Sequence, residues 1–157
     1  AAESGAPDRL PPMSDPTPEP TPESTQQRTV ITFGTFDVFH VGHLKVIQRA
    51  SELGDRLVVG VSADALNLRK KGREPVFSEG ERMAIVSALK PVDAVFLEES
   101  LEQKRDYILE HGADVLVMGD DWAGRFDEFR DVCEVVYLPR TPAISTTALI
   151  EKISGTS

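Results

Sequence analysis

The chain has 157 residues, 40% of them hydrophobic, which suits one domain with a real core. Its 26 acidic and 17 basic residues give a formal net charge of -9, so we expect no nucleic-acid partner. No apolar run reaches the roughly 18 residues of a membrane span, so we expect no membrane partner. The single cysteine, Cys133, excludes an internal disulfide framework and is interpreted as a small buried side chain in a cytoplasmic protein.

Residues 1–28 differ in composition from the rest of the chain. They hold most of its eleven prolines, in stretches such as DPTPEPTPE, and few hydrophobic residues. Because so little apolar surface cannot offset the entropy lost on ordering, we predict a disordered or polyproline-II-like tail over 1–28. Residues 29–157 are predicted to form one domain.

From Thr29 onward, short apolar runs alternate with helical patterns. A strand is predicted at 29–33, then a helix with apolar residues from 44 to 53 that ends at Gly54, and a strand at 56–62. A polar loop over 66–77 leads to a helix that Ser78 caps. The remaining predicted elements are a strand at 94–97, a helix at 101–111 closed by Gly112, strands at 114–119 and 133–138, and a helix at 145–153.

Five short strands alternating with helices predict an α/β domain with an open parallel sheet flanked by helices. In such sheets, ligands bind beyond the carboxyl ends of the strands, near the point where the strand order reverses. The segments that follow the predicted strands contain paired histidines, a basic cluster, a paired aspartate and a helix start rich in Ser and Thr. We therefore expect polar chemistry to gather at one edge of the sheet.

His40 and His43 lie where the first strand gives way to the first helix. Their i, i+3 spacing allows both rings to face the same way, and Gly42 leaves room for a ligand to approach the backbone. Because helix N-termini attract anions, two imidazoles there suit a phosphate whose charge grows in a transition state. A zinc pair is the rival functional interpretation, although further ligands are scarce. Structural roles as cap and core are the other alternative.

Two further groups of residues suit anions. Arg140 offers a planar fork for phosphate oxygens, and Ser145, Thr146 and Thr147 place hydroxyl groups at the start of the last helix. Lys70, Lys71 and Arg73 form a basic cluster after the second strand. Ordinary N-capping by Ser145 and a solvated basic loop are the structural alternatives. Together with the histidines, these groups predict a site for one polyphosphate.

GTFDVFHVGH, followed late in the chain by RTPAISTT, resembles the HxGH nucleotidylyltransferase superfamily. This resemblance implies a Rossmann-like fold and transfer of a nucleoside monophosphate to a phosphorylated acceptor, with release of pyrophosphate. VMGDDWAGRFDEF and EVVYLPRT resemble the glycerol-3-phosphate cytidylyltransferases, which make CDP-glycerol for teichoic-acid synthesis. The similarity runs from about Thr29 to Ile153.

The resemblance implies roles for individual residues. His40 and His43 stabilise the pentacovalent phosphorus, and Lys71, favoured over Lys70, is both catalytic and acceptor-binding. Lys104 contacts the acceptor. The implied nucleotide-binding residues are Thr35, Phe36, Asp37, Gly42, Arg73, Gly119, Asp120, Arg140, Thr141, Ile144, Ser145, Thr146 and Thr147.

The family leads us to expect Mg²⁺ on the triphosphate, with no dedicated protein metal site, and a homodimer acting on small-molecule substrates. Two alternatives stay open. One is an adenylyltransferase acting on FMN or on a sugar or polyol phosphate, and the other is a non-catalytic nucleotide-binding module.

Overall fold

The computed structural model describes residues 27–139 and 145–155. Its centre is a five-stranded sheet in the order β4-β3-β2-β5-β6, and every neighbouring pair is parallel. The strands are β2 (Thr29–Gly34), β3 (Arg56–Ser62), β4 (Ala94–Glu98), β5 (Val115–Gly119) and β6 (Glu134–Leu138). This confirms the predicted parallel α/β fold.

The strand order reverses between β2 and β5. From β2 the chain builds outward through β3 to β4, and then returns to add β5 and β6 on the other side. The turns that leave β2 and β5 therefore diverge, which opens a crevice at the carboxyl ends of these two strands.

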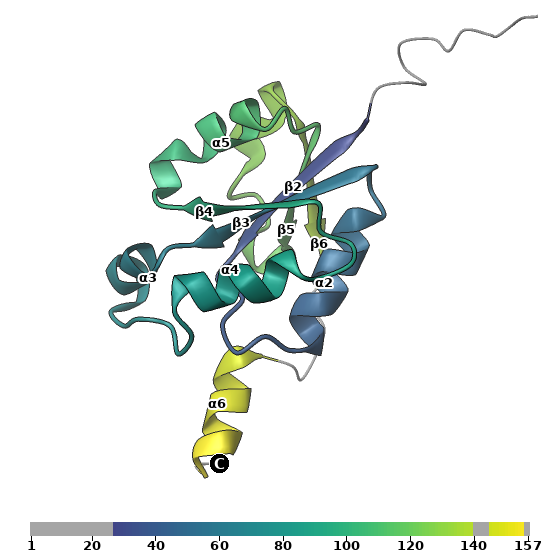
Figure 1. Cartoon of the computed structure of the whole chain (residues 1–157). Helices are drawn as coiled ribbons and strands as arrows, with labels where there is room; N and C mark the ends of the chain where they lie inside the picture. The colour runs from purple at the N-terminus through teal and green to yellow at the C-terminus, as the bar shows by residue number, and fades with distance from the viewer. Residues whose placement is uncertain (1–26, 140–144, 156–157) are drawn as a thin grey trace, which may run out of the picture.

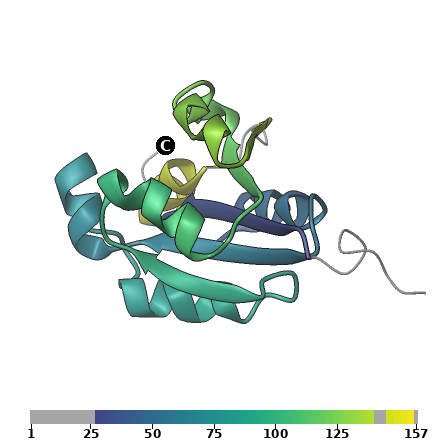
Figure 2. The same ribbon diagram turned by 90° about the horizontal axis from the view of Figure 1, so that it is seen from above.

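Helices cover both faces of the sheet (Figure 1). The helices of the described residues are α2 (Val41–Ser51), α3 (Asp64–Lys71), α4 (Glu79–Ser87), α5 (Lys104–Glu110) and α6 (Thr146–Ser154), with short 3-10 turns η3 (Leu101–Gln103), η4 (Asp120–Trp122) and η5 (Asp127–Asp131). Among them, α6 extends away from the sheet in Figure 1. Seen from above in Figure 2, α5 and the 3-10 turns lie on the opposite side of the sheet from α2 and α4. None of the helices within 27–139 and 145–155 is long and apolar enough to cross a membrane.

Each face of the sheet has its own apolar core. On one face, Ile47 and Ala50 of α2 and Val86 of α4 pack against the strands. On the other face, Ile108 of α5 and Phe129 of η5 do so, and the half-buried Cys133 joins this second cluster. Burial on both faces explains why the strands read as continuous β-branched runs instead of alternating patterns.

The predicted end of the first helix is wrong. Helix α2 ends at Ser51, and its C-cap, Glu52, keeps a right-handed conformation. Gly54 serves a different need, because a Cβ atom there would lie 2.5 Å from the carbonyl oxygen of Arg28. The glycine permits a close approach of two backbone segments, so it is not the left-handed cap that we predicted.

The predicted polar loop over 66–77 is also partly wrong, because α3 occupies its first half. The helix is anchored by the buried side chains of Leu66 and Asn67, and it ends at Gly72, whose φ of 76° favours glycine. Asp64 and Glu79 cap one another's helices: Oε1 of Glu79 accepts the Asp64 N–H, and Oδ2 of Asp64 accepts the Glu79 N–H. These stabilising contacts come from sequence-distant residues, so the apolar pattern of the segment did not reveal them.

Most of the predicted tail lies outside the described residues. Its last residue, Arg28, contacts the domain through three groups: its N–H donates to Asp55, its Nε to the carbonyl oxygen of Leu53, and its guanidinium pairs with Glu134. By these contacts, Arg28 is part of the folded domain. The division of the chain at 28 otherwise stays a prediction.

Candidate active site

A cavity of about 720 Å³ opens at the carboxyl ends of the strands. Its walls come from the turns after β2, β3, β4 and β5 and from the start of α6. This volume is in the range that holds a small-molecule ligand. Several residues that the sequence analysis selected lie in its walls: Thr35, Phe36, Asp37, His43, Lys71, Arg73, Lys104, Gly119, Thr146 and Thr147.

The other selected residues fall into two groups. His40, Gly42, Asp120 and Ser145 lie in the turns and helix starts that border the cavity. Ser145 is the N-cap of α6, and its hydroxyl oxygen accepts the N–H of Ala148. Arg140, Thr141 and Ile144 lie outside the described residues.

The turn between β2 and α2 is strained. Phe36 and Val38 have φ values of 55° and 47°, in a region that costs a β-branched residue such as Val most. Asp37 lies between them and holds the turn: Oδ1 accepts the N–H groups of Val38 and Phe77, and Oδ2 accepts that of Val76. One buried carboxylate therefore ties the β2–α2 turn to the segment before α4.

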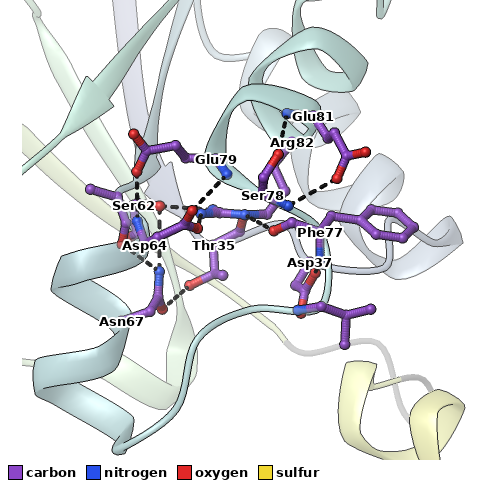
Figure 3. Close-up of polar contacts among 12 residues, drawn as sticks. Thr35, Asp37, Ser62, Asp64, Asn67, Phe77, Ser78, Glu79, Glu81 and Arg82 are labelled. Atoms are coloured by element: carbon purple, nitrogen blue, oxygen red, sulfur yellow. Dashed lines mark hydrogen bonds and ion pairs between the residues drawn. The ribbon is translucent and has the colours of Figure 1, made fainter.

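Arg82 joins the same turn to two other elements (Figure 3). Its side chain is fully buried, and its guanidinium donates to the carbonyl oxygens of Thr35, Ser62 and Phe77. It also forms an ion pair of 2.6 Å with Asp64. Because a planar fork with five donors can satisfy several carbonyls at once, Arg82 fixes the ends of β2 and β3 relative to α4.

The two histidines lie side by side at the N-terminus of α2. Their rings are stacked, with centroids 3.8 Å apart. His40 is the N-cap, and its Nδ1 accepts the N–H of Gly42 at 3.0 Å; Nδ1 of His43 accepts the N–H of His40 at 3.2 Å. The local backbone thus holds one nitrogen of each ring and leaves Nε2 of each for other partners.

Thr146 of α6 meets both free nitrogens. Its Oγ1 lies 3.3 Å from Nε2 of His40 and 3.4 Å from Nε2 of His43, and its hydroxyl donates to the carbonyl oxygen of Asp37. Since the single hydroxyl hydrogen is used there, the two imidazoles act as donors from Nε2. The arrangement presents two N–H groups that converge on one point.

Both imidazoles are held in the neutral form. Burial, and then the neighbouring His40, lower the pKa of His43 from 6.5 to about 4, although Asp37 opposes the shift. Burial also lowers the pKa of His40. A proton on either Nδ1 would face a backbone N–H, so the hydrogen bonds of the helix start favour the same form. The pair offers neutral hydrogen-bond donors at pH 7.

The opposite end of the cavity is ionic. Lys104, at the start of α5, is 2% exposed, and its Nζ lies 2.7 Å from Oε2 of Glu98, the last residue of β4. The same Nζ lies 3.6 Å from the centre of the Phe33 ring. Burial lowers the pKa of Lys104, while Glu98 raises it.

The basic cluster after β3 belongs to the same cavity wall. Lys70, Lys71 and Arg73 all line the cavity and are exposed. Burial of its ammonium group lowers the pKa of Lys70, and Glu98 counters that effect. Lys70, which the sequence ranked below Lys71, therefore lines the same cavity as Lys71.

Sequence reasoning missed three polar residues of the site. Glu98 and Arg82 were given no role, and Asn67 was placed in a loop. Asn67 is buried, accepts the Thr35 hydroxyl and donates to the carbonyl oxygen of Ala63. The acidic residue at the end of an apolar strand could have marked Glu98 as a candidate, but the sequence does not show that Lys104 is its partner.

The donors of this cavity suit phosphate oxygens better than a metal ion. Within the part of the chain that the structure describes, no group of three or more His, Cys, Asp or Glu side chains could hold a metal. The Asp37 carboxylate is already engaged by three amide N–H groups. Lysine ammonium groups, imidazole N–H groups and a helix N-terminus remain, and all of them favour anions.

A parallel α/β sheet whose cavity brings neutral histidines and lysines together defines a binding site for phosphorylated small molecules. The family model described as cytidylyltransferase-like matches residues 31–156, and the chain belongs to this family. The predicted superfamily is thereby confirmed.

Named relatives refine the comparison. The chain is 50% identical over 128 residues to glycerol-3-phosphate cytidylyltransferase of Bacillus subtilis (strain 168), an alignment that covers 82% of this chain and 98% of the relative. It is 40% identical over 128 residues to the protein of the same name from Staphylococcus aureus (strain NCTC 8325 / PS 47), with 82% and 96% covered. Among solved structures, the lipopolysaccharide core biosynthesis protein from Thermoplasma volcanium GSS1 superposes with a TM-score of 0.64 at 28% identity, covering 74% of this chain and 99% of that one.

Proposed function

We propose that the protein is a glycerol-3-phosphate cytidylyltransferase, which converts CTP and glycerol 3-phosphate to CDP-glycerol and pyrophosphate. The observation that carries the proposal is 50% identity to an enzyme of that name over nearly its whole length. The cavity supports it, because its two ends offer different groups to the two phosphorylated substrates. The CDP-glycerol formed would serve teichoic-acid synthesis.

The reaction is a displacement at the α-phosphorus of CTP. An oxygen of the acceptor phosphate forms the new bond, the bond from the α-phosphorus to the bridging oxygen breaks, and pyrophosphate leaves. Because the acceptor phosphate is already an anion at neutral pH, no strong general base is needed. The protein must hold two polyanions together and stabilise the charge that develops between them.

In this proposal, His40 and His43 stabilise the charge that develops during the reaction. Their Nε2 hydrogens, which converge on Thr146 in the structure, donate to the oxygens of the reacting phosphate and of the leaving group. Neutral imidazoles fixed by backbone hydrogen bonds need little reorganisation as the charge develops. Thr146 and Thr147, with the start of α6, border the same space and bind the β- and γ-phosphates.

The lysines hold the two phosphorylated substrates together. Lys104 binds the acceptor phosphate at the β4 end, and the basic cluster at Lys70, Lys71 and Arg73 binds phosphate between the two substrates. Thr35, Phe36 and the turn after β5 at Gly119 and Asp120 border the space for the nucleoside. Arg140, Thr141 and Ile144 stay predictions from the resemblance.

Three further features belong to the proposal. Mg²⁺ would be held by the triphosphate and water instead of by protein side chains, and it would supply charge shielding that makes pyrophosphate a better leaving group. The enzyme works in the cytoplasm, where nucleoside triphosphates are made. It forms a homodimer, which size-exclusion chromatography with light scattering would test by a mass of two chains.

Pyrophosphate release tests the function. The purified protein in magnesium buffer is given CTP or ATP, each with glycerol 3-phosphate, FMN or a panel of sugar and polyol phosphates. We expect release with CTP and glycerol 3-phosphate, and CDP-glycerol as the second product. Turnover only with another pair of substrates would refute the assigned substrates, and no turnover across the panel would refute the proposed activity.

A further inference from the structure

Glu98 is an unusual residue for its position. It ends β4, a strand that otherwise consists of Ala, Val, Phe and Leu, and it is 1% exposed. A buried carboxylate is costly unless partners replace the water that it loses. Glu98 has two such partners, since Oε1 accepts the hydroxyl of Ser62 at 3.1 Å and Oε2 accepts the ammonium of Lys104 at 2.7 Å.

The pair lies in the wall of the cavity, not in the apolar core. Both Glu98 and Lys104 line the cavity, together with Phe33 and Phe126. The Lys104 ammonium lies 3.6 Å from the centre of the Phe33 ring and 5.2 Å from that of Phe126. A long and flexible side chain is thus held in one place by a carboxylate and two aromatic faces.

Such a pair is a weak source of stability. The cost of removing two charges from water largely offsets their attraction, so apolar residues of similar size would stabilise the fold at least as well. A fixed ammonium that borders a cavity is useful for a different reason. It has three donors, of which Glu98 uses one, and it does not have to be ordered when an anion binds.

We propose that Glu98 is a positioning residue, which holds the ammonium of Lys104 in place to receive the phosphate of the acceptor. This inference rests on the proposed function, because it takes the β4 end of the cavity as the acceptor site. Glu98 acts through Lys104 and does not itself contact the reacting atoms.

The charge of Lys104 depends on the same residue. Burial lowers its pKa, Lys70 lowers it further, and Glu98 raises it. Ser62, Phe33 and Phe126, which also lie around the pair, carry no charge. Without Glu98, we expect Lys104 to lose its proton at a lower pH than in the wild-type protein.

Steady-state kinetics of Glu98→Gln test the proposal. The substitution keeps the size of the side chain and an oxygen for Ser62 but removes the charge. We expect KM for glycerol 3-phosphate to rise about tenfold or more while KM for CTP changes less than about twofold, because the loss of one buried charge partner acts at the acceptor end alone. We also expect kcat/KM for the acceptor to begin its alkaline decline at a lower pH.

Two variants control for other causes. Glu99→Gln makes the same change at the exposed neighbouring residue and should leave both KM values unchanged. Glu98→Asp keeps the charge but shortens the side chain, so we expect a raised KM for the acceptor with the alkaline limb at its wild-type pH. If the Glu98→Gln protein folds poorly, KM for the acceptor in the Glu98→Asp protein tests the positioning role instead.

A double-mutant cycle with Lys104→Met separates a positioning role from a general structural one. If Glu98 acts through Lys104, Glu98→Gln should have little further effect on KM for the acceptor in the Lys104→Met protein. Additive effects, equal rises in both KM values, or an unchanged or lower acceptor KM in Glu98→Gln would overturn the inference. A wild-type protein inactive with CTP and glycerol 3-phosphate would instead overturn the proposed function, whereas an active wild type with additive variants would overturn only the role of Glu98.

Discussion

The two ends of the cavity hold their polar side chains by different means. At the histidine end, backbone N–H groups two and three residues away fix His40 and His43 and favour their neutral forms. At the lysine end, the carboxylate of Glu98 at the end of β4 fixes Lys104 at the start of α5 and favours its charged form. Developing charge thus meets rigid neutral donors, whereas a substrate that is already charged meets a fixed cation.

The difference has a cost on each side. The histidine end needs a turn with two non-glycine residues at positive φ, Phe36 and Val38, which Asp37 holds in place. The lysine end needs a buried ion pair and therefore a partner for every charge. We expect variants at the first end to lower kcat and variants at the second to raise KM.

The largest expected effect is that of His43→Ala. Losing one donor aimed at the developing charge should lower kcat about 10²- to 10³-fold, with a small change in KM for either substrate. Turnover of CTP and glycerol 3-phosphate measures the effect, and circular dichroism checks the fold. His111→Ala is the matched control, since His111 packs on Phe96 at the far end of α5 and should be replaceable with near-normal turnover. A near-normal kcat for His43→Ala would contradict the role of the histidine end.

Next in size is the effect of the neighbouring lysines. Lys71 is the favoured candidate from the sequence, but Lys70 also lines the cavity, and burial lowers its pKa while Glu98 raises it. We expect Lys70→Met to raise KM for CTP or for glycerol 3-phosphate about tenfold, which corresponds to the loss of one hydrogen bond to a charged group. Lys71→Met should raise the same KM less. Measuring KM for both substrates with both variants decides between the two lysines. A larger rise for Lys71→Met would show that Lys71 is the more important phosphate-binding residue.

A smaller effect is expected for Thr146→Val. The change removes the oxygen on which both imidazole N–H groups converge, so kcat should fall about threefold to tenfold, as for the loss of ordinary hydrogen bonds. Thr146→Ser keeps the hydroxyl and should restore most of the rate. If serine fails as valine does, the methyl group and its packing matter more than the hydrogen bonds.

The smallest expected effect is on stability at acid pH. His43 has a pKa of about 4 in the folded chain and an ordinary value of 6.5 when exposed, so the unfolded chain binds the additional proton between these values. The free energy of unfolding should therefore decline as pH falls from about 6.5 towards 4. Denaturant titrations at several pH values should show a shallower decline for His43→Gln, with the lowered pKa of His40 still contributing. An unchanged slope would mean that folding does not lower the pKa of His43.

The strands and most caps were predictable because their causes are local. β3 follows its apolar run residue for residue, and Ser78 caps α4 with Glu81 in the reciprocal arrangement that their spacing favours. The histidine site is local as well, since the i, i+3 spacing of His40 and His43 produces both the cap and the stacked rings. Within the described residues, these features needed no knowledge of distant contacts.

The remaining features depend on contacts between distant parts of the chain. α3 was predicted as a loop because the contacts that stabilise it include Glu79 and the end of β3. The sequence gives no sign that Arg82 is buried, yet it is fully buried, and its guanidinium binds three carbonyl groups and Asp64. Neither the formation of α3 nor the burial of Arg82 follows from hydrophobic periodicity. Periodicity shows which face of an element is apolar, but it does not show which polar groups contact that element.

Short-range patterns of apolar and capping residues specify the five strands, the helices α2, α4, α5 and α6, and the paired histidines, so these elements follow from the sequence alone. The pairing of Glu98 with Lys104, the position of Thr146 beside both imidazoles and the contacts of Asp37 and Arg82 around the cavity became visible in the folded chain. A buried polar group needs a partner in space, and the fold brings such partners together from up to 109 positions apart.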